Sequence, residues 1–124
     1  MRISQKSINK NLEGEIFYLL YQVITDLKNP QETKIFIGDI LNKNELTVIS
    51  KRLAIAYYLE NKRSYQNIKD NLKVSSATIA SIDKMRKNKG YLLALKKIEA
   101  DRWATEWAGK IEKWFKGKKN KVSK

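Results

Sequence analysis

The fold of this chain follows from residues 64–86, which read SYQNIKDNLKVSSATIASIDKMR. Ser64 can cap a short helix, because its hydroxyl can accept a hydrogen bond from a backbone N–H that has no partner in the first turn. Ile68 and Leu72 lie four residues apart and give that helix one apolar stripe. Val74 follows, where it can pack inside a turn. The pattern predicts a short helix that ends in a tight turn.

A second helix is predicted after this turn, capped by Ser75 or Ser76. Its inward face would carry Ile79, Ile82 and Met85 at spacings of three. Its outward side chains are mostly small, which would let the helix backbone lie close to base edges in a major groove about 12 Å wide. These outward residues are Ser76, Ala77, Thr78, Ala80 and Ser81, followed by Lys84 and Lys87. The alternative is an ordinary helical hairpin in an all-α core, with solvated Ser and Thr side chains.

The composition excludes several classes of site. The chain has 124 residues, of which 42% are hydrophobic, which suits one domain with a modest core. It contains no cysteine and no histidine, so disulfides, thiol nucleophiles, histidine acid–base chemistry and most transition-metal sites are excluded. No nucleophile–base pair can be named, so we expect no enzyme, no catalytic residue, no metal and no cofactor. The first residues, MRISQKSINKN, carry no apolar run of secretory length, and no apolar run in the sequence is long enough to span a membrane, so we expect a soluble, cytoplasmic protein without a membrane partner.

The net charge of +13 is unevenly distributed along the chain. Residues 1–41 hold five basic and five acidic side chains, residues 42–91 hold eleven and four, and residues 92–124 hold ten and four. The excess therefore lies after residue 41, in the part of the chain that contains the helix-turn-helix and the final helix, as expected of a chain that neutralises phosphates and releases counterions. A lysine-rich composition that serves solubility would also give a basic protein, but it does not explain the neutral first third.

The first predicted helix covers residues 8–27. Its segment IFYLLYQVI (16–24) is apolar nearly all round, which suggests burial between subunits, or else a deep core helix. Asn29 and Pro30 end this helix and open a second one, over residues 31–41. The residues that this second helix is expected to bury are Ile35, Phe36, Ile37, Ile40 and Leu41.

A third helix is predicted to begin after Asn42, with Glu45 as the reciprocal partner in a capping box. Its apolar stripe is Leu46, Ile49, Leu53, Ala56 and Leu59.

A final helix is expected over residues 91–115, after the basic segment RKNKG (86–90). One stripe of it holds Trp103, Trp107, Ile111 and Trp114, beside Ala100, Ala104 and Ala108. Such a stripe is typical of a packing face, although interleaved Trp and Lys could also stack on bases. Residues 116–124, KGKKNKVSK, are expected to form a disordered basic tail. With no strand signal, the sequence predicts one all-α domain of about six helices over residues 1–115.

Residues 36–46 and 51–82 resemble the Trp repressor superfamily, especially its uncharacterised TrpR-like branch. The residues that carry the resemblance are Glu45-Leu46, Arg52, Ser64-Tyr65 and Val74-Ser75 followed by Ala77-Thr78-Ile79. The resemblance covers less than half of the chain. It implies an intertwined homodimer whose N-terminal helices interlock, with two recognition helices that enter successive major grooves about 34 Å apart on a pseudo-palindromic operator.

The resemblance also implies residue roles. It assigns base-facing positions to Ser76, Ala77, Thr78 and Ala80, with Gln66 aimed at a base edge from the first helix, and backbone contacts to Lys69 and Lys87. The whole candidate DNA-binding set is Gln66, Lys69, Ser75, Ser76, Ala77, Thr78, Ala80, Ser81, Lys84 and Lys87.

Three positions depart from the family pattern. The two arginines that hold the amino-acid co-repressor in this family correspond here to Ala54 and Ser81, so tryptophan is not expected as a co-repressor. Lys73 stands where the turn commonly carries glycine, which costs about 1 kcal/mol if its φ is positive.

We therefore expect a homodimeric, sequence-specific DNA-binding transcription regulator that needs neither tryptophan nor a metal. A small-molecule effector other than tryptophan stays open. The alternative function is a basic helical adaptor that binds RNA or an acidic protein partner.

Overall fold

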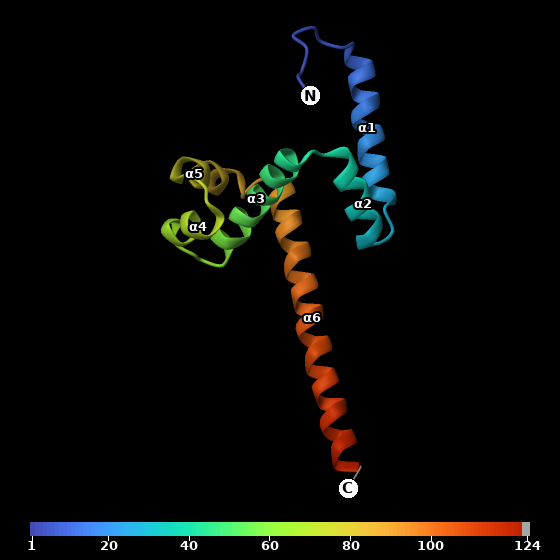
Figure 1. Cartoon of the computed structure of the whole chain (residues 1–124), viewed down its shortest axis with the longest axis vertical. Helices are drawn as coiled ribbons and strands as arrows, with labels where there is room; N and C mark the ends of the chain where they lie inside the picture. The colour runs from blue at the N-terminus through green and yellow to red at the C-terminus, as the bar shows by residue number, and fades with distance from the viewer. Residues whose placement is uncertain (123–124) are drawn as a thin grey trace. The chain divides into compact units, whose positions relative to one another are not determined.

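The computed structural model describes residues 1–122, with the side chains of residues 1–114, 116 and 117 (Figure 1). Within these residues the regular structure is entirely helical, as predicted. The helices are α1 (Lys10–Asp26), α2 (Pro30–Ile40), α3 (Lys43–Glu60), α4 (Tyr65–Leu72), α5 (Ser76–Met85) and α6 (Lys89–Val122). None of these helices in the described part of the chain is long and apolar enough to cross a membrane.

The chain divides into two compact units, residues 1–46 and residues 47–124. The single domain expected over residues 1–115 stays a prediction.

Side-chain caps start the helices of the first unit. The Asn9 side chain accepts a hydrogen bond from the Asn11 backbone N–H at 2.8 Å, and the Asn29 side chain accepts one from Glu32 at 2.9 Å. Asn42 and Glu45 form the predicted capping box at the start of α3, with bonds of 2.8 and 2.9 Å. These local signals set where α1, α2 and α3 begin.

The apolar residues of the first unit are largely uncovered in the single chain. Helix α1 buries no residue, and Leu19 at its centre is 64% exposed. The prediction that α2 buries Ile35 and Ile40 is wrong for this chain alone, because Ile35 is 67% exposed and Ile40 is exposed as well. Phe36, Ile37 and Leu41 were also expected to be buried, and they are half-buried. Two helices in so short a unit provide too little surface to cover both of their faces.

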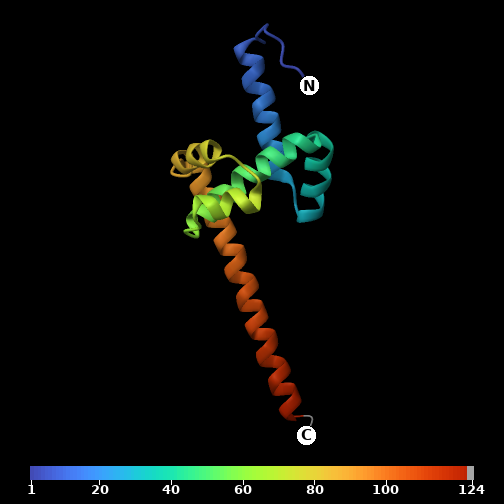
Figure 2. The same ribbon diagram turned by 60° about the vertical axis from the view of Figure 1, so that its left-hand side comes forward.

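The second unit has a small core that joins four helices. Ile55, Ala56 and Leu59 of α3 contact Ile68 of α4, Ile79 and Ile82 of α5 and Leu95 of α6 in one buried cluster. Figures 1 and 2 show α4 and α5 beside the second half of α3. Leu72, Val74 and Met85 are half-buried against this cluster, in the inward positions that the sequence predicted.

The stripe predicted for α3 is correct only in its second half. Ala56 and Leu59 are buried, but Leu46, Ile49 and Leu53 are exposed, and Ile55 is fully buried although the pattern did not include it. The reason is that the core residues of α4, α5 and α6 lie against the second half of the helix alone.

Helix α6 is longer than predicted. It begins at Lys89 rather than residue 91 and continues to Val122 rather than ending at residue 115. Residues 116–122, expected as part of a disordered tail, are helical, which agrees with the good helix propensity of lysine and the absence of proline. Residues 123–124 of the expected tail lie outside the described residues.

Candidate nucleic-acid interface

Two serine caps define the helix-turn-helix of α4 and α5. The Ser64 hydroxyl accepts a hydrogen bond from the Asn67 backbone N–H at 3.1 Å, and the Ser75 hydroxyl accepts one from Thr78 at the same distance. Of the two serines considered for the second cap, Ser75 takes the role and Ser76 is the first residue of α5. Ser75 therefore determines where α5 begins, and its side chain is exposed.

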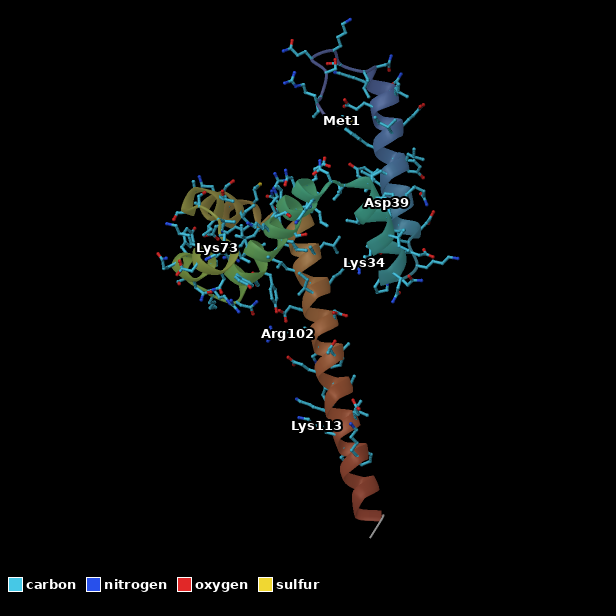
Figure 3. All side chains as sticks on the ribbon, in the orientation of Figure 1. Met1, Lys34, Asp39, Lys73, Arg102 and Lys113 are labelled. Atoms are coloured by element: carbon cyan, nitrogen blue, oxygen red, sulfur yellow. The ribbon has the colours of Figure 1, made fainter. Side chains whose placement is uncertain are left out.

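The turn between the two helices contains a residue in the left-handed region. Lys73 has a φ of 55° and a ψ of 56°, so the positive φ considered for this glycine-like position is present. Figure 3 labels Lys73 at the end of α4. Its backbone N–H donates to the Lys69 carbonyl at 3.0 Å, and its own carbonyl accepts from the Lys51 ammonium at 3.4 Å. These bonds fix the turn and hence the direction in which α5 leaves it.

Helix α5 has a buried side and an exposed side. Ile79 and Ile82 are buried, whereas Ala77, Ser81 and Lys84, at spacings of four and three, are exposed on the opposite side. The other candidates on this helix flank that exposed side. Ser76 and Thr78 are exposed, and Ala80 is half-buried.

The remaining candidates lie on α4 and just after α5. Gln66, Lys69 and Lys87 are all exposed. The Gln66 amide donates to the Asp70 carboxylate at 2.8 Å, so it must leave that bond to reach a base edge.

A polar network that the sequence did not predict ties the helices together. The Tyr65 hydroxyl donates to the Asp83 carboxylate at 2.8 Å, and the Arg86 guanidinium donates to Asp83 at 2.8 Å and to Glu60 at 2.9 Å. The bonds join the start of α4, the end of α5 and the end of α3. Tyr65 and Asp83 are 18 residues apart and Glu60 and Arg86 are 26 apart, so no local pattern indicated them.

The network keeps Asp83 ionised. The hydrogen bond from Arg86, and after it the bond from Tyr65, lower the pKa of the Asp83 carboxyl. The same bond to Asp83 is the main cause that raises the pKa of the Tyr65 hydroxyl.

The basic charge around the helix-turn-helix is almost uncompensated. Residues 47–98 contain twelve Lys or Arg side chains and three carboxylates, Glu60, Asp70 and Asp83. Each of these carboxylates accepts a hydrogen bond within the chain, from Arg86, Gln66 or Tyr65. The surface that surrounds α5 is therefore suited to a polyanion.

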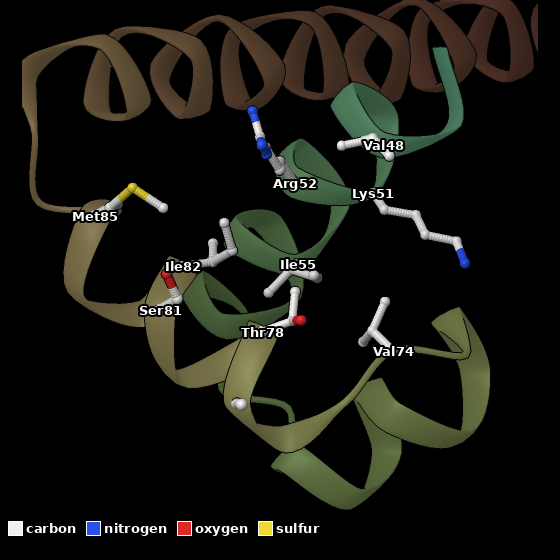
Figure 4. A pocket seen from close by; sticks show the side chains of 10 residues that line it. Val48, Lys51, Arg52, Ile55, Val74, Thr78, Ser81, Ile82 and Met85 are labelled. Carbon is white, nitrogen blue, oxygen red and sulfur yellow. The ribbon is translucent and has the colours of Figure 1, made fainter. Parts of the chain in front are cut away.

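A pocket of about 530 Å³ lies between α3 and α5, and its lining is mostly apolar (Figure 4). Arg52 of α3 lines it together with Lys51, and Ser81 and Thr78 line it from α5. Ala54, which the resemblance places at one of the two co-repressor arginine positions, does not line this pocket. Arg52 of α3 therefore contributes a guanidinium to this pocket, whereas α5 contributes the hydroxyl of Ser81 in place of an arginine.

No metal site can be named in the described residues, because no three His, Cys, Asp or Glu side chains there are grouped to hold an ion.

Comparison with known proteins shows the family. The model of the Trp repressor protein family matches residues 15–98, which is more than half of the chain. This chain belongs to the Trp repressor family. The uncharacterized protein YerC of Bacillus subtilis (strain 168) is 28% identical over 90 residues, which cover 71% of this chain and 86% of that protein. The crystal structure of a TrpR-like protein from Eubacterium eligens ATCC 27750 matches with a TM-score of 0.66 and 28% identity, over 73% of this chain and 96% of that one.

The family match includes the whole helix-turn-helix and stops within α6. Residues 99–122 of this Trp repressor family member therefore lie beyond the part that the family model describes.

Proposed function

We propose that this Trp repressor family member is a homodimeric, sequence-specific transcription regulator that inserts α5 into the major groove of a pseudo-palindromic operator. The observation that carries the proposal is the division of α5 into a buried apolar side, with Ile79 and Ile82, and an exposed side of small residues. A helix that packs on the protein core through one side, and carries small side chains on the other, can approach base edges closely. Such a regulator acts in the cytoplasm, where it meets DNA.

The charges of the second unit support the same binding mode. Lys69 of α4, Lys84 of α5 and Lys87 just after α5 are exposed, and Asp70 and Asp83 accept hydrogen bonds within the chain. Lysines in these positions would contact phosphates, which fixes the protein on the duplex and makes its affinity strongly dependent on salt. Base readout then falls to Ser76, Ala77, Thr78 and Ala80, with Gln66 reaching from α4.

The uncovered apolar helices of the first unit support the dimer. Helix α1 buries none of its residues in the single chain, although Phe17, Leu20 and Ile24 give it a largely apolar surface. A second copy that interlocks with α1 and α2 would cover this surface, because a continuous exposed apolar surface usually marks a contact with another protein chain. Two α5 helices related by a two-fold axis would then read two half-sites one helical turn apart.

The test is selection of duplexes from a random-sequence library by the full chain at about 0.15 M salt, near physiological ionic strength. We expect a symmetric consensus with half-sites about 10 base pairs apart. Thr78→Arg should weaken binding to that consensus by about tenfold or more, because the larger arginine side chain prevents the close approach of α5 to the base edge. Thr105→Arg on α6 adds the same side chain and the same charge away from α5, so it should leave the consensus and the affinity unchanged.

Two results would overturn the proposal. Unchanged affinity of Thr78→Arg for the selected operator would remove α5 from the interface. Absence of a consensus, with equal binding to random duplex, single strands and heparin, would instead favour a basic helical adaptor for RNA or an acidic protein.

A further inference from the structure

The last part of α6 carries an exposed apolar surface that the family fold does not explain. All three tryptophans of the chain, Trp103, Trp107 and Trp114, lie after residue 98, where the family match ends. Trp103 is 62% exposed, Trp107 is 47% exposed, and Ile111 is exposed beside them. Large apolar side chains that are exposed in one continuous stripe mark an interaction surface.

Contacts with the rest of the second unit are concentrated at the start of α6. Leu95 is buried in the core, and the Arg102 guanidinium donates to the Tyr57 hydroxyl of α3 at 2.8 Å. Further along, the ion pairs Arg102–Glu106 and Lys116–Glu112 join residues of α6 itself. Figures 1 and 2 both show α6 continuing away from α3, α4 and α5.

The apolar residues have the spacing of a coiled-coil seam. Ala100, Ala104, Trp107, Ile111 and Trp114 follow one another at intervals of four, three, four and three. This alternation repeats every seven residues, and it is the pattern by which two helices bury a shared stripe. Trp103 widens the seam, with its ring 5.6 Å from that of Trp107 between centroids.

The charges along the same segment favour an antiparallel partner with the same sequence. Residues 99–106 contain three carboxylates and one arginine, whereas residues 108–115, which lie opposite them when Ala100 pairs with Trp114 in antiparallel orientation, contain two lysines and one glutamate. Two copies in parallel would place the lysine-rich ends together. Two antiparallel copies place each acidic end beside a basic end, which favours this orientation.

The sizes of the side chains along the seam also favour the antiparallel orientation. The small residues Ala100 and Ala104 occupy the first half of the seam, and the large residues Ile111 and Trp114 occupy the second half. Antiparallel pairing places small side chains of one helix opposite large side chains of the other, which allows close packing without voids.

We propose that residues 99–114 of α6 form a self-association surface, on which the same segment of a second copy binds in antiparallel orientation. This surface is additional to the dimer proposed through α1 and α2, and it does not depend on DNA binding. Glu99 and Glu106 are four residues before and three residues after Trp103, so they lie beside it on the helix surface, where their charges oppose a nucleic acid or an anionic lipid surface.

Cross-linking of single-cysteine variants tests the orientation, since the full chain has no native cysteine. Glu99→Cys and Lys116→Cys lie 17 residues apart, or about 25 Å along the helix, which is beyond the reach of a bismaleimide of about 10 Å. Mixed variants in the absence of DNA should give the 99–116 product between copies. Products that join residue 99 to 99 and residue 116 to 116 would show parallel pairing and overturn the proposal.

A seam variant and a matched control test the surface. Ile111→Glu places a charge in the seam and should reduce the cross-linked product by about tenfold or more, whereas Thr105→Glu on the opposite side of α6 should leave it unchanged. Because the three tryptophans all lie in this segment, their fluorescence reports on it directly. The emission should shift to longer wavelength in Ile111→Glu.

Other occupants of the surface give different results. Equal cross-linking of Ile111→Glu and Thr105→Glu would overturn the proposal. So would tryptophan emission that moves to shorter wavelength only when phosphatidylglycerol vesicles or single-stranded DNA are added, and these results would assign the surface to a membrane or to nucleic acid.

Discussion

Replacing Lys73 with glycine should stabilise the protein, although it removes a side chain from the helix-turn-helix. Lys73 has a φ of 55° and a ψ of 56°, a conformation that costs a residue with a side chain about 1–2 kcal/mol. Glycine avoids this cost but loses about 0.5–1 kcal/mol through the greater freedom of its unfolded chain. The difference of about 0–1.5 kcal/mol predicts that Lys73→Gly raises the free energy of unfolding, by about 0.75 kcal/mol at the centre of this range.

Lys69→Gly is the matched control, because it is the same substitution four residues earlier, at an exposed position inside α4. Both variants lose one positive charge and one side chain, and they differ in backbone conformation. Lys69→Gly should lower the free energy of unfolding by about 1 kcal/mol, since glycine is unfavourable within a helix. The two variants are thus expected to change stability in opposite directions.

Urea unfolding followed by circular dichroism at 222 nm measures both effects, at one protein concentration because association adds to stability. We expect the two midpoints to fall on opposite sides of the wild-type value, with unchanged slopes. Equal destabilisation by Lys73→Gly and Lys69→Gly would refute the reasoning, because it would mean that the turn at residue 73 is not strained.

Three further predictions concern the candidate interface. Lys69→Ala should weaken binding to operator and random duplex alike and reduce the slope of log K against log salt by about 0.9, and a loss confined to the operator would contradict a phosphate contact. Tyr65→Phe should lower the free energy of unfolding at neutral pH, because it removes the bond from the Tyr65 hydroxyl to Asp83. Since the pKa of Asp83 is lowered in the folded chain, this loss should become smaller when urea unfolding is measured below about pH 4, where Asp83 becomes protonated. A loss that does not change with pH would contradict the role of the Tyr65–Asp83 bond. Tryptophan should leave operator affinity unchanged in a titration, because Ser81 cannot stack on an indole, and tighter binding would show that Arg52 and the apolar lining suffice.

Local signals in the sequence predicted the features that position the interface. The Ser64 and Ser75 caps, the Asn42–Glu45 capping box and the inward positions of Ile79 and Ile82 each depend on residues no more than four apart. Interactions over this distance are determined by helix geometry, so the order of amino acids is enough to predict them.

Features that depend on distant residues were not predictable in the same way. The bond between Arg86 and Glu60 joins positions 26 residues apart, and Arg52 reaches the pocket because of how α3 and α5 pack. The stripe of α3 illustrates the same limit, because Ile49 is 50% exposed while Ile55 is fully buried. Periodicity indicated that apolar residues share a face, but the neighbouring helices determine how far along the helix that face is covered.

The same distinction explains the two apolar surfaces that stay exposed in the single chain. Periodicity predicts that α1 and the last part of α6 are packing faces, and it does not say whether the packing partner belongs to the same chain. Most of helix α1, from residue 15 onward, lies within the family match at residues 15–98, whereas residues 99–114 lie beyond it. A family member without the extension could therefore form the α1 dimer, but only a chain with the extension could add the second contact. If both proposals hold, the family domain supplies DNA recognition, and the seam of α6 determines which further copies assemble with it.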